Sequence, residues 1–237
     1  MWTTPVLVLL HNGFDTARTW EPVLKHIPHN IRIIAYDRQG YGSRFFPGHT
    51  RQPADIVEEG IDELSRMIDS LVSPDRQVYL WGHCVGGAIA LAWAGRNPGK
   101  VHGIIGEAVG FSSNQKMSER AGRLLRDYNE LGQEYQNHFE KMHGKNARDF
   151  WDLIRAHKTS YIMDPNYTIV PDVVNIRAPV LLLQGDRDIY FTPEDCEQWA
   201  SSIPRARVRL VSGGMHDLHS QNPEGIANLV MQFLESV

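Results

Sequence analysis

The most informative part of the sequence is Trp81-Gly82-His83-Cys84-Val85-Gly86-Gly87. A short apolar run, Val78-Tyr79-Leu80, leads directly into it, and a helical pattern of small residues follows it. A side chain that projects from a sharp strand-to-helix turn needs neighbours without a Cβ atom, because a Cβ would collide with the adjacent strand or helix. We therefore expect Cys84 to lie exposed in a strained turn at the edge of a sheet. The N-terminal end of the following helix then points at the sulfur and favours its thiolate form.

Apolar runs of strand length alternate along the chain with helical patterns, which is typical of a mostly parallel sheet covered by helices on both faces. The expected strands are 5–10, 31–36, 78–80, 101–106, 179–184 and 206–211. Between Ala54 and Leu71 the apolar residues recur at three or four positions, the period of a helix with one buried face, and Pro53 suits its start. A closing helix is expected from about Pro223 to Val237. The sequence thus predicts an α/β fold with a doubly wound sheet.

The segment 111–172 breaks this alternation, because it is rich in charged residues and helix formers. We interpret it as a helical cap inserted into a core formed by 1–110 and 173–237. Its aromatic and methionine side chains either line a pocket over Cys84 or only pack the cap against the core; these residues are Met142, Phe150, Trp151, Tyr161 and Met163. We take Trp151 and Tyr161 as the pocket candidates from the cap.

Composition excludes several classes of partner. The 237 residues suit a single α/β domain with an insertion, and 24 basic against 28 acidic side chains give a net charge of −4 without a block of like charge. Neither nucleic acid nor an anionic membrane is therefore expected as a partner. The N-terminus has no basic leader, and no apolar run approaches the ~20 residues of a membrane span. With Cys84 in a catalytic-looking turn, Cys84 and Cys196 are expected as free thiols, which indicates a reducing compartment and a cytoplasmic protein.

Four further motifs accompany the central turn. They are His11-Asn12-Gly13-Phe14 after the first strand, Asp37-Arg38-Gln39-Gly40-Tyr41-Gly42-Ser43 after the second, Gly185-Asp186-Arg187-Asp188, and Gly213-Gly214-Met215-His216. In these motifs, and in their order, the chain resembles the α/β-hydrolase fold superfamily over nearly its whole length outside the cap. Two departures stand out. Only Met1–Thr4 precede the first parallel strand, so the two N-terminal antiparallel strands common in that family are expected to be missing, and cysteine replaces the usual serine.

The resemblance implies a catalytic triad of Cys84 as nucleophile, His216 as base and Asp188 as the acid that orients the imidazole. It also implies an oxyanion hole formed by the backbone N–H groups of Phe14 and Val85. No cofactor is implied. The expected enzyme is a hydrolase that cleaves a small, largely apolar ester, thioester or lactone through an acyl-cysteine intermediate.

Several assignments stay open on the sequence alone. Cys84 can instead be an inert thiol in a catalytically dead relative, or an engineered replacement for serine. His219 competes with His216 as the base, and Asp186 competes with Asp188 as the acid. His11 and His83 flank the site in sequence and either bind substrate or pack. A metal pair of His216 and His219 is disfavoured, because no third ligand accompanies them and glycines precede them, so we expect no metal.

Other functions compete with hydrolysis. An acyltransferase or cyclase would discharge the thioester to an amine, alcohol or thiol. Related triads also support cleavage of carbon–carbon bonds, and a non-catalytic member of the same fold would only bind a ligand.

Overall fold

The computed structural model describes residues 4–46, 55–113, 115–157, 164 and 166–237. Its centre is a six-stranded sheet in which every pairing is parallel, with the order β2-β1-β3-β4-β5-β6. The strands are β1 (Val6–Leu10), β2 (Arg32–Ala35), β3 (Val78–His83), β4 (Gly103–Glu107), β5 (Val180–Gly185) and β6 (Ala206–Val211). The four inner strands are buried along their whole length, which explains why they appear in the sequence as continuous apolar runs.

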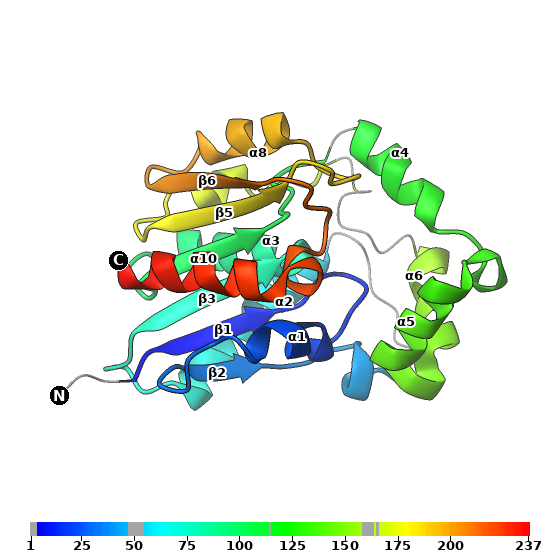
Figure 1. Ribbon diagram of the computed structural model, residues 1–237, viewed down its shortest axis with the longest axis horizontal. Coiled ribbons are helices and arrows are strands. Elements are labelled where there is room, and N and C mark those ends of the chain that lie inside the picture. The colour runs from blue at the N-terminus through cyan, green and yellow to red at the C-terminus, as the bar shows by residue number, and fades with distance from the viewer. Residues whose placement is uncertain (1–3, 47–54, 114, 158–163, 165) are drawn as a thin grey trace.

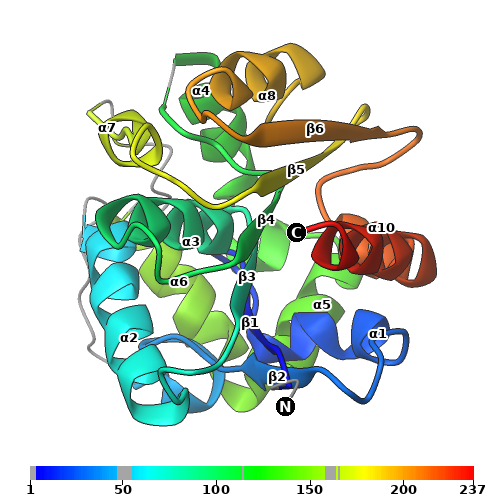
Figure 2. The same cartoon turned by 90° about the vertical axis from the view of Figure 1, so that its left-hand side faces the viewer.

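Helices cover both faces of the sheet (Figures 1 and 2). One face packs against α2 (Asp55–Leu71), α3 (Val85–Arg96), α7 (Val170–Val173) and α8 (Pro193–Ala200). The other packs against α1 (Glu21–Leu24), α9 (Leu218–Gln221) and α10 (Pro223–Glu235), with the short 3₁₀ helix η1 (Ala17–Trp20) beside them. Two separate apolar cores result, one on each side of the sheet. The predicted doubly wound α/β architecture is confirmed.

A second group of helices lies beyond the carboxyl ends of the strands, where the arrowheads of Figure 1 point. This group contains α4 (Gln115–Leu124), α5 (Gln133–His143) and α6 (Ala147–His157), joined by the 3₁₀ helices η3 (Tyr128–Glu130) and η4 (Gly144–Asn146). A further 3₁₀ turn, η2 (Gly42–Arg44), follows β2. All three longer helices fall within 111–172, and the side chains of α5 and α6 form small apolar clusters with the loops after β1 and β2.

The boundaries of the helices and strands agree closely with those expected from the sequence, with a few exceptions. Each predicted strand has a counterpart, but β4 begins at Gly103 rather than at residue 101. The short helices α1, α8 and α9 were not expected, although α8 carries a local signal, since Thr192 and Asp195 form a reciprocal capping box at its start. Pro53 and Ala54, expected at the start of α2, lie outside the described residues. In the described part of the chain every strand belongs to the parallel sheet.

Candidate active site

Cys84 occupies the turn between β3 and α3, with φ 52° and ψ −118°. A positive φ is costly for a residue that has a Cβ, so this conformation stores strain that the surrounding structure must hold. The glycines on either side make the turn possible: a Cβ on Gly82 would overlap the carbonyl of Gly86, and a Cβ on Gly86 would overlap the carbonyl of Leu10. The backbone N–H of Cys84 donates to the carbonyl of Glu107 at 2.9 Å, which fixes the turn to β4. The side chain is partly exposed, as the sequence predicted.

The structure brings Cys84, His216 and Asp188 together from three distant loops. His216 Nδ1 lies 2.9 Å from Asp188 Oδ2, and the His216 side chain also hydrogen-bonds Cys84. Asp188 is held in turn by the backbone N–H of Tyr190 at 2.7 Å and by Gln184 Nε2 at 3.1 Å. Burial alone would lower the pKa of His216, but the Asp188 carboxylate and the Cys84 sulfur raise it well above its usual range. The protonated form of His216, beside the Asp188 carboxylate, is therefore favoured.

The competing candidates occupy other positions. Asp186 Oδ1 accepts a hydrogen bond from the backbone N–H of Gly213 at 2.8 Å, so this carboxylate ties two loops together. His219 is fully buried, and its Nδ1 lies 2.7 Å from Glu107 Oε1. Neither residue takes part in the contacts around Cys84 that the structure describes.

The loop after β1 differs from expectation at the position of the oxyanion donor. The backbone N–H of Phe14 donates to Asn12 Oδ1 at 2.8 Å, because the Asn12 side chain folds back over its own turn. That N–H is thus already used. The N–H groups of Gly13 and Val85 donate to no acceptor among the described residues, and a Cβ built on Gly13 would lie 3.7 Å from Val85 Cγ1. We therefore propose the N–H of Gly13, in place of that of Phe14, as the partner of the Val85 N–H.

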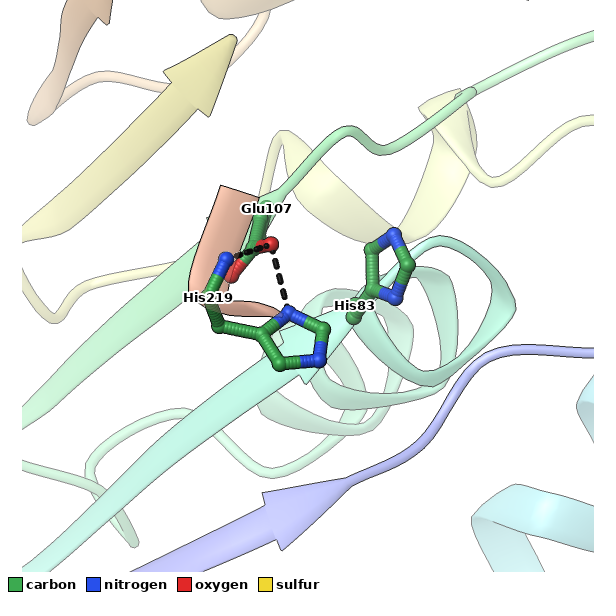
Figure 3. Close-up of side chains that lie close together, drawn as sticks. All are labelled: His83, Glu107 and His219. Atoms are coloured by element: carbon green, nitrogen blue, oxygen red, sulfur yellow. Dashed lines mark hydrogen bonds and ion pairs between the residues drawn. The ribbon is translucent and has the colours of Figure 1, made fainter. Parts of the chain in front are cut away.

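Behind the turn lies a cluster of three fully buried side chains, His83, Glu107 and His219, called here the buried polar cluster (Figure 3). Their ligand-type atoms lie within 4.8 Å of one another, as in a metal site. Each has protein partners, however. Glu107 Oε2 accepts from Trp81 Nε1 at 3.1 Å, and His219 Nε2 lies 3.0 Å from Thr19 Oγ1.

His83 makes different contacts from the other two members of the cluster. Its Nε2 lies 3.1 Å from the carbonyl oxygen of His216, and its Nδ1 lies 3.3 Å from Asn12 Nδ2. Burial lowers the pKa of His83 to about 4, so the ring is neutral at pH 7. We interpret the buried polar cluster as a hydrogen-bond network that supports the loops carrying Cys84 and His216.

The helix α5 contacts the loop after β1 through two histidines. His138 Nε2 lies 2.5 Å from Oδ1 of the buried Asp15, and His143 Nε2 lies 2.8 Å from the carbonyl oxygen of Phe14. Asp15 also accepts a hydrogen bond from Asn12 Nδ2 at 2.8 Å. The Asp15 contact raises the pKa of His138, and His138 holds the pKa of Asp15 below its usual range despite burial. These residues had no sequence signal, because the pair joins positions 123 residues apart.

The other pocket candidates have mainly structural contacts. His11 is fully buried, accepts the backbone N–H of Arg38 on Nε2 at 3.0 Å, and contacts the carbonyl of Asn12 through Nδ1. Trp151 is buried between Phe14 and Phe139, with Nε1 donating to the carbonyl of Arg126 at 2.9 Å. Met142 on α5 and Phe150 on α6 are also buried, in contacts with Thr16 in the loop after β1 and Tyr41 in the loop after β2. Tyr161 and Met163 lie outside the described residues.

Two further findings concern the whole molecule. Both cysteines are free thiols, and Cys196 is buried on α8, where burial raises its pKa to about 12. Of the helices in the described ranges, none combines the length and the apolar character that crossing a membrane requires.

Comparison with known proteins gives consistent matches over most of the chain. The alpha/beta hydrolase family matches residues 7–229. The chain is 20% identical to the monoacylglycerol lipase ABHD6 of Bos taurus over 98% of this chain and 76% of that protein. It is 22% identical to the (R)-3-hydroxydecanoyl-ACP:CoA transacylase of Pseudomonas putida over 97% of this chain and 83% of that protein.

Among solved structures, the fold is similar to that of a thermophilic esterase from Thermogutta terrifontis, with a TM-score of 0.73 and 18% identity, covering 99% of this chain and 90% of that chain.

Proposed function

The chain belongs to the alpha/beta hydrolase family, and on this premise we propose that it hydrolyses small, largely apolar esters, thioesters or lactones through a covalent acyl intermediate on Cys84. One observation carries the proposal. A strained, glycine-flanked turn presents the sulfur to an imidazole that is itself oriented by a carboxylate 2.9 Å away. Nucleophile, base and orienting acid in this arrangement are what acyl transfer by covalent catalysis requires.

The reaction follows from these positions. The Cys84 sulfur attacks the acyl carbon, a sulfur–carbon bond forms, and the electron pair of the carbonyl bond moves to oxygen. The N–H groups of Val85 and Gly13 receive this oxyanion; donors of this kind are each worth roughly 3–4 kcal/mol of barrier. When the tetrahedral intermediate collapses, the bond to the leaving group breaks, and His216 gives its proton to the departing atom. Water then attacks the thioester carbon, and His216 takes the proton of this water. The carbon–sulfur bond breaks, which releases the carboxylic acid and leaves the sulfur on Cys84.

Residues 111–172 act in this proposal as a cap over the site. Support comes from the place of α5 and α6 beyond the carboxyl ends of the strands, where loops of such sheets carry their ligands. The free thiols support the expected reducing, cytoplasmic setting.

Acyl transfer to a second acceptor is the competing function, and the similarity to a transacylase favours keeping it. The first half-reaction is the same, because both routes form the thioester on Cys84. The two routes differ at the second step, where acyl transfer uses an alcohol, amine or thiol in place of water. Product analysis with and without added acceptors separates them: hydrolysis predicts the free acid as the main product in both cases.

The nucleophile is tested with p-nitrophenyl butanoate and two variants of Cys84. Cys84→Ala is expected to abolish turnover, whereas Cys84→Ser keeps a measurable part of it, because a hydroxyl can still be activated by His216. Cys196→Ser is the matched control, since it removes the buried thiol and leaves the site intact. Unchanged turnover in Cys84→Ala would show that Cys84 is not the nucleophile. A wild-type protein that binds the ester but is never acylated would be a non-catalytic, ligand-binding member of the fold.

A further inference from the structure

A cavity of about 250 Å³ opens beside the imidazole of His216. Its lining includes Phe14 from the loop after β1, Tyr135 from α5, Tyr190 from the loop after β5, and Asp217 next to His216 itself. The ring of Tyr190 lies 4.6 Å from that of His216, measured between centroids. In the proposed reaction His216 protonates the leaving group, so the leaving group must sit against this ring. The cavity is therefore placed to hold the leaving-group side of the substrate.

Three of the exposed residues that line the cavity are apolar. Tyr135, Ile189 and Met215 line it from three separate segments, and they are exposed by 57%, 58% and 54%. These are three of the few large apolar side chains that the described chain leaves to solvent. Exposed apolar residues that gather from distant segments around one cavity indicate a surface that contacts a ligand. The body of the bound group is accordingly apolar.

The cavity is lined by two carboxylates, Asp15 and Asp217, and by the imidazoles of His138 and His216. The charge of His216 is balanced by Asp188, with which it is paired at 2.9 Å, so the net charge depends on the partners of the two lining carboxylates. Asp15 is paired with His138 at 2.5 Å. The ion-pair partner of Asp217 in the same part of the chain is His83 at 3.7 Å, and that ring is neutral at pH 7, since burial lowers its pKa to about 4. Asp217 is 52% exposed and thus meets whatever enters. No lysine or arginine is among the described residues that line the cavity.

We propose that this cavity, with Asp217 and the aromatic rings of Tyr135 and Tyr190, selects a leaving group that is apolar and positively charged, as in the ester of an amino alcohol. The proposal rests on the proposed function and adds its substrate class. A cation is attracted by the carboxylate and by the faces of aromatic rings, whereas a carboxylate or sulfonate is repelled. Cleavage forms the acyl–sulfur bond, breaks the ester carbon–oxygen bond, and transfers the His216 proton to the departing alkoxide oxygen, so the cationic group itself is unchanged.

The test compares three butanoate esters that differ in the charge of the alcohol: choline, its neutral isostere 3,3-dimethylbutan-1-ol, and 3-hydroxypropane-1-sulfonate. Initial rates are followed by titration of the released acid at pH 7. The choline ester is expected to exceed the neutral isostere in kcat/KM by about three- to tenfold, the range of an exposed ion pair with a cation–π contact. High salt should reduce the ratio, because the carboxylate is half-exposed. Asp217→Asn should bring the ratio close to one, while Asp69→Asn, an exposed carboxylate on α2, should leave it unchanged.

Equal rates for the choline and neutral esters, or a preference for the sulfonate, would overturn the inference and leave the hydrolase proposal standing. A preference for the choline ester over the neutral ester that persists in Asp217→Asn would also overturn the inference. If no ester acylates the protein, the proposed function fails, and the cavity is then tested by binding alone. Choline should slow alkylation of Cys84 by iodoacetamide more than 3,3-dimethylbutan-1-ol does, and equal protection by the two would reject a cation site.

Discussion

Replacing Glu107 by glutamine tests the buried polar cluster on which the Cys84 turn rests. Glu107 ends β4, and its backbone carbonyl accepts the N–H of Cys84. Its carboxylate lies 2.7 Å from His219 Nδ1 and accepts the His219 backbone N–H at 3.0 Å. Glutamine has nearly the same volume but no charge, and it cannot supply two acceptor oxygens to His219 and Trp81 at once. The variant therefore removes the ion pair without opening a cavity.

The magnitude follows from the pKa of the carboxyl. Burial raises the pKa of Glu107, but the charge and hydrogen bonds of His219 outweigh this and lower it from 4.5 to about 2. At roughly 1.4 kcal/mol for each pH unit, this difference corresponds to about 3 kcal/mol of stabilisation. Both side chains are fully buried, so solvent screening is small. Removing one partner of a buried pair typically costs a similar amount, about 3–5 kcal/mol.

The pKa shifts of Glu107 and His219 determine how the stability of the fold changes with pH. The lowered pKa of Glu107 gives stability that is complete above about pH 4.5 and is lost as the pH falls toward 2. The raised pKa of His219 gives stability that is complete below about 6.5 and is lost as the pH rises through its folded value. The pair thus contributes most between about pH 4.5 and 6.5.

Urea unfolding at a series of pH values is the assay, with Glu235→Gln, an exposed residue at the end of α10, as the control. Glu107→Gln should lose about 3 kcal/mol of unfolding free energy at pH 6, and this deficit should shrink by about 2 kcal/mol at pH 3. A deficit below about 1 kcal/mol at pH 6, or one that does not change with pH, would mean that the ion pair of Glu107 and His219 does not stabilise the fold.

Three other predictions concern the site. Gly86→Ala should lose about 2–3 kcal/mol of stability in urea unfolding and most of its activity, because the new Cβ overlaps a backbone carbonyl of β1. A fully active variant would contradict this expectation. His138→Gln should lower kcat about tenfold by releasing the loop held through Asp15, with His138→Arg restoring it. The wild-type kcat should fall as the pH rises through the raised pKa of His138, a limb that His138→Arg lacks; identical pH profiles would exclude this role. His216→Gln should slow alkylation of Cys84 by iodoacetamide at pH 7, and an unchanged rate would mean that the imidazole does not activate the sulfur.

Much of the fold was predictable because buried parallel strands leave continuous apolar runs in the sequence, and β1, β3 and β5 are such runs. The Cys84 turn was predictable for a different reason. Its conformation leaves no room for a Cβ at positions 82 and 86, and a glycine pair with this spacing at the end of an apolar strand is typical of such a turn. Both sequence patterns are local, so they can be recognised without knowledge of the rest of the structure.

What the sequence did not indicate depends on contacts between distant segments. The proposal of Gly13 rather than Phe14 as a donor depends on the direction of the Asn12 side chain, which no sequence pattern encodes. The pairing of Glu107 with His219 joins positions 112 residues apart, and Glu107 lies one residue beyond the expected end of β4, so no local pattern indicates this contact. The cavity beside His216 is assembled from several loops and from α5, and its charge depends on which neighbouring histidines are protonated.

In the proposed reaction the acyl group passes through the sulfur of Cys84. This intermediate can be detected by mass spectrometry of the intact protein, acid-quenched within milliseconds of mixing with p-nitrophenyl butanoate. We expect a single butanoyl increment that peptide mapping places on Cys84 and that is missing from Cys84→Ala. An increment on another residue, or steady turnover with no acyl group on the protein at any time, would contradict it.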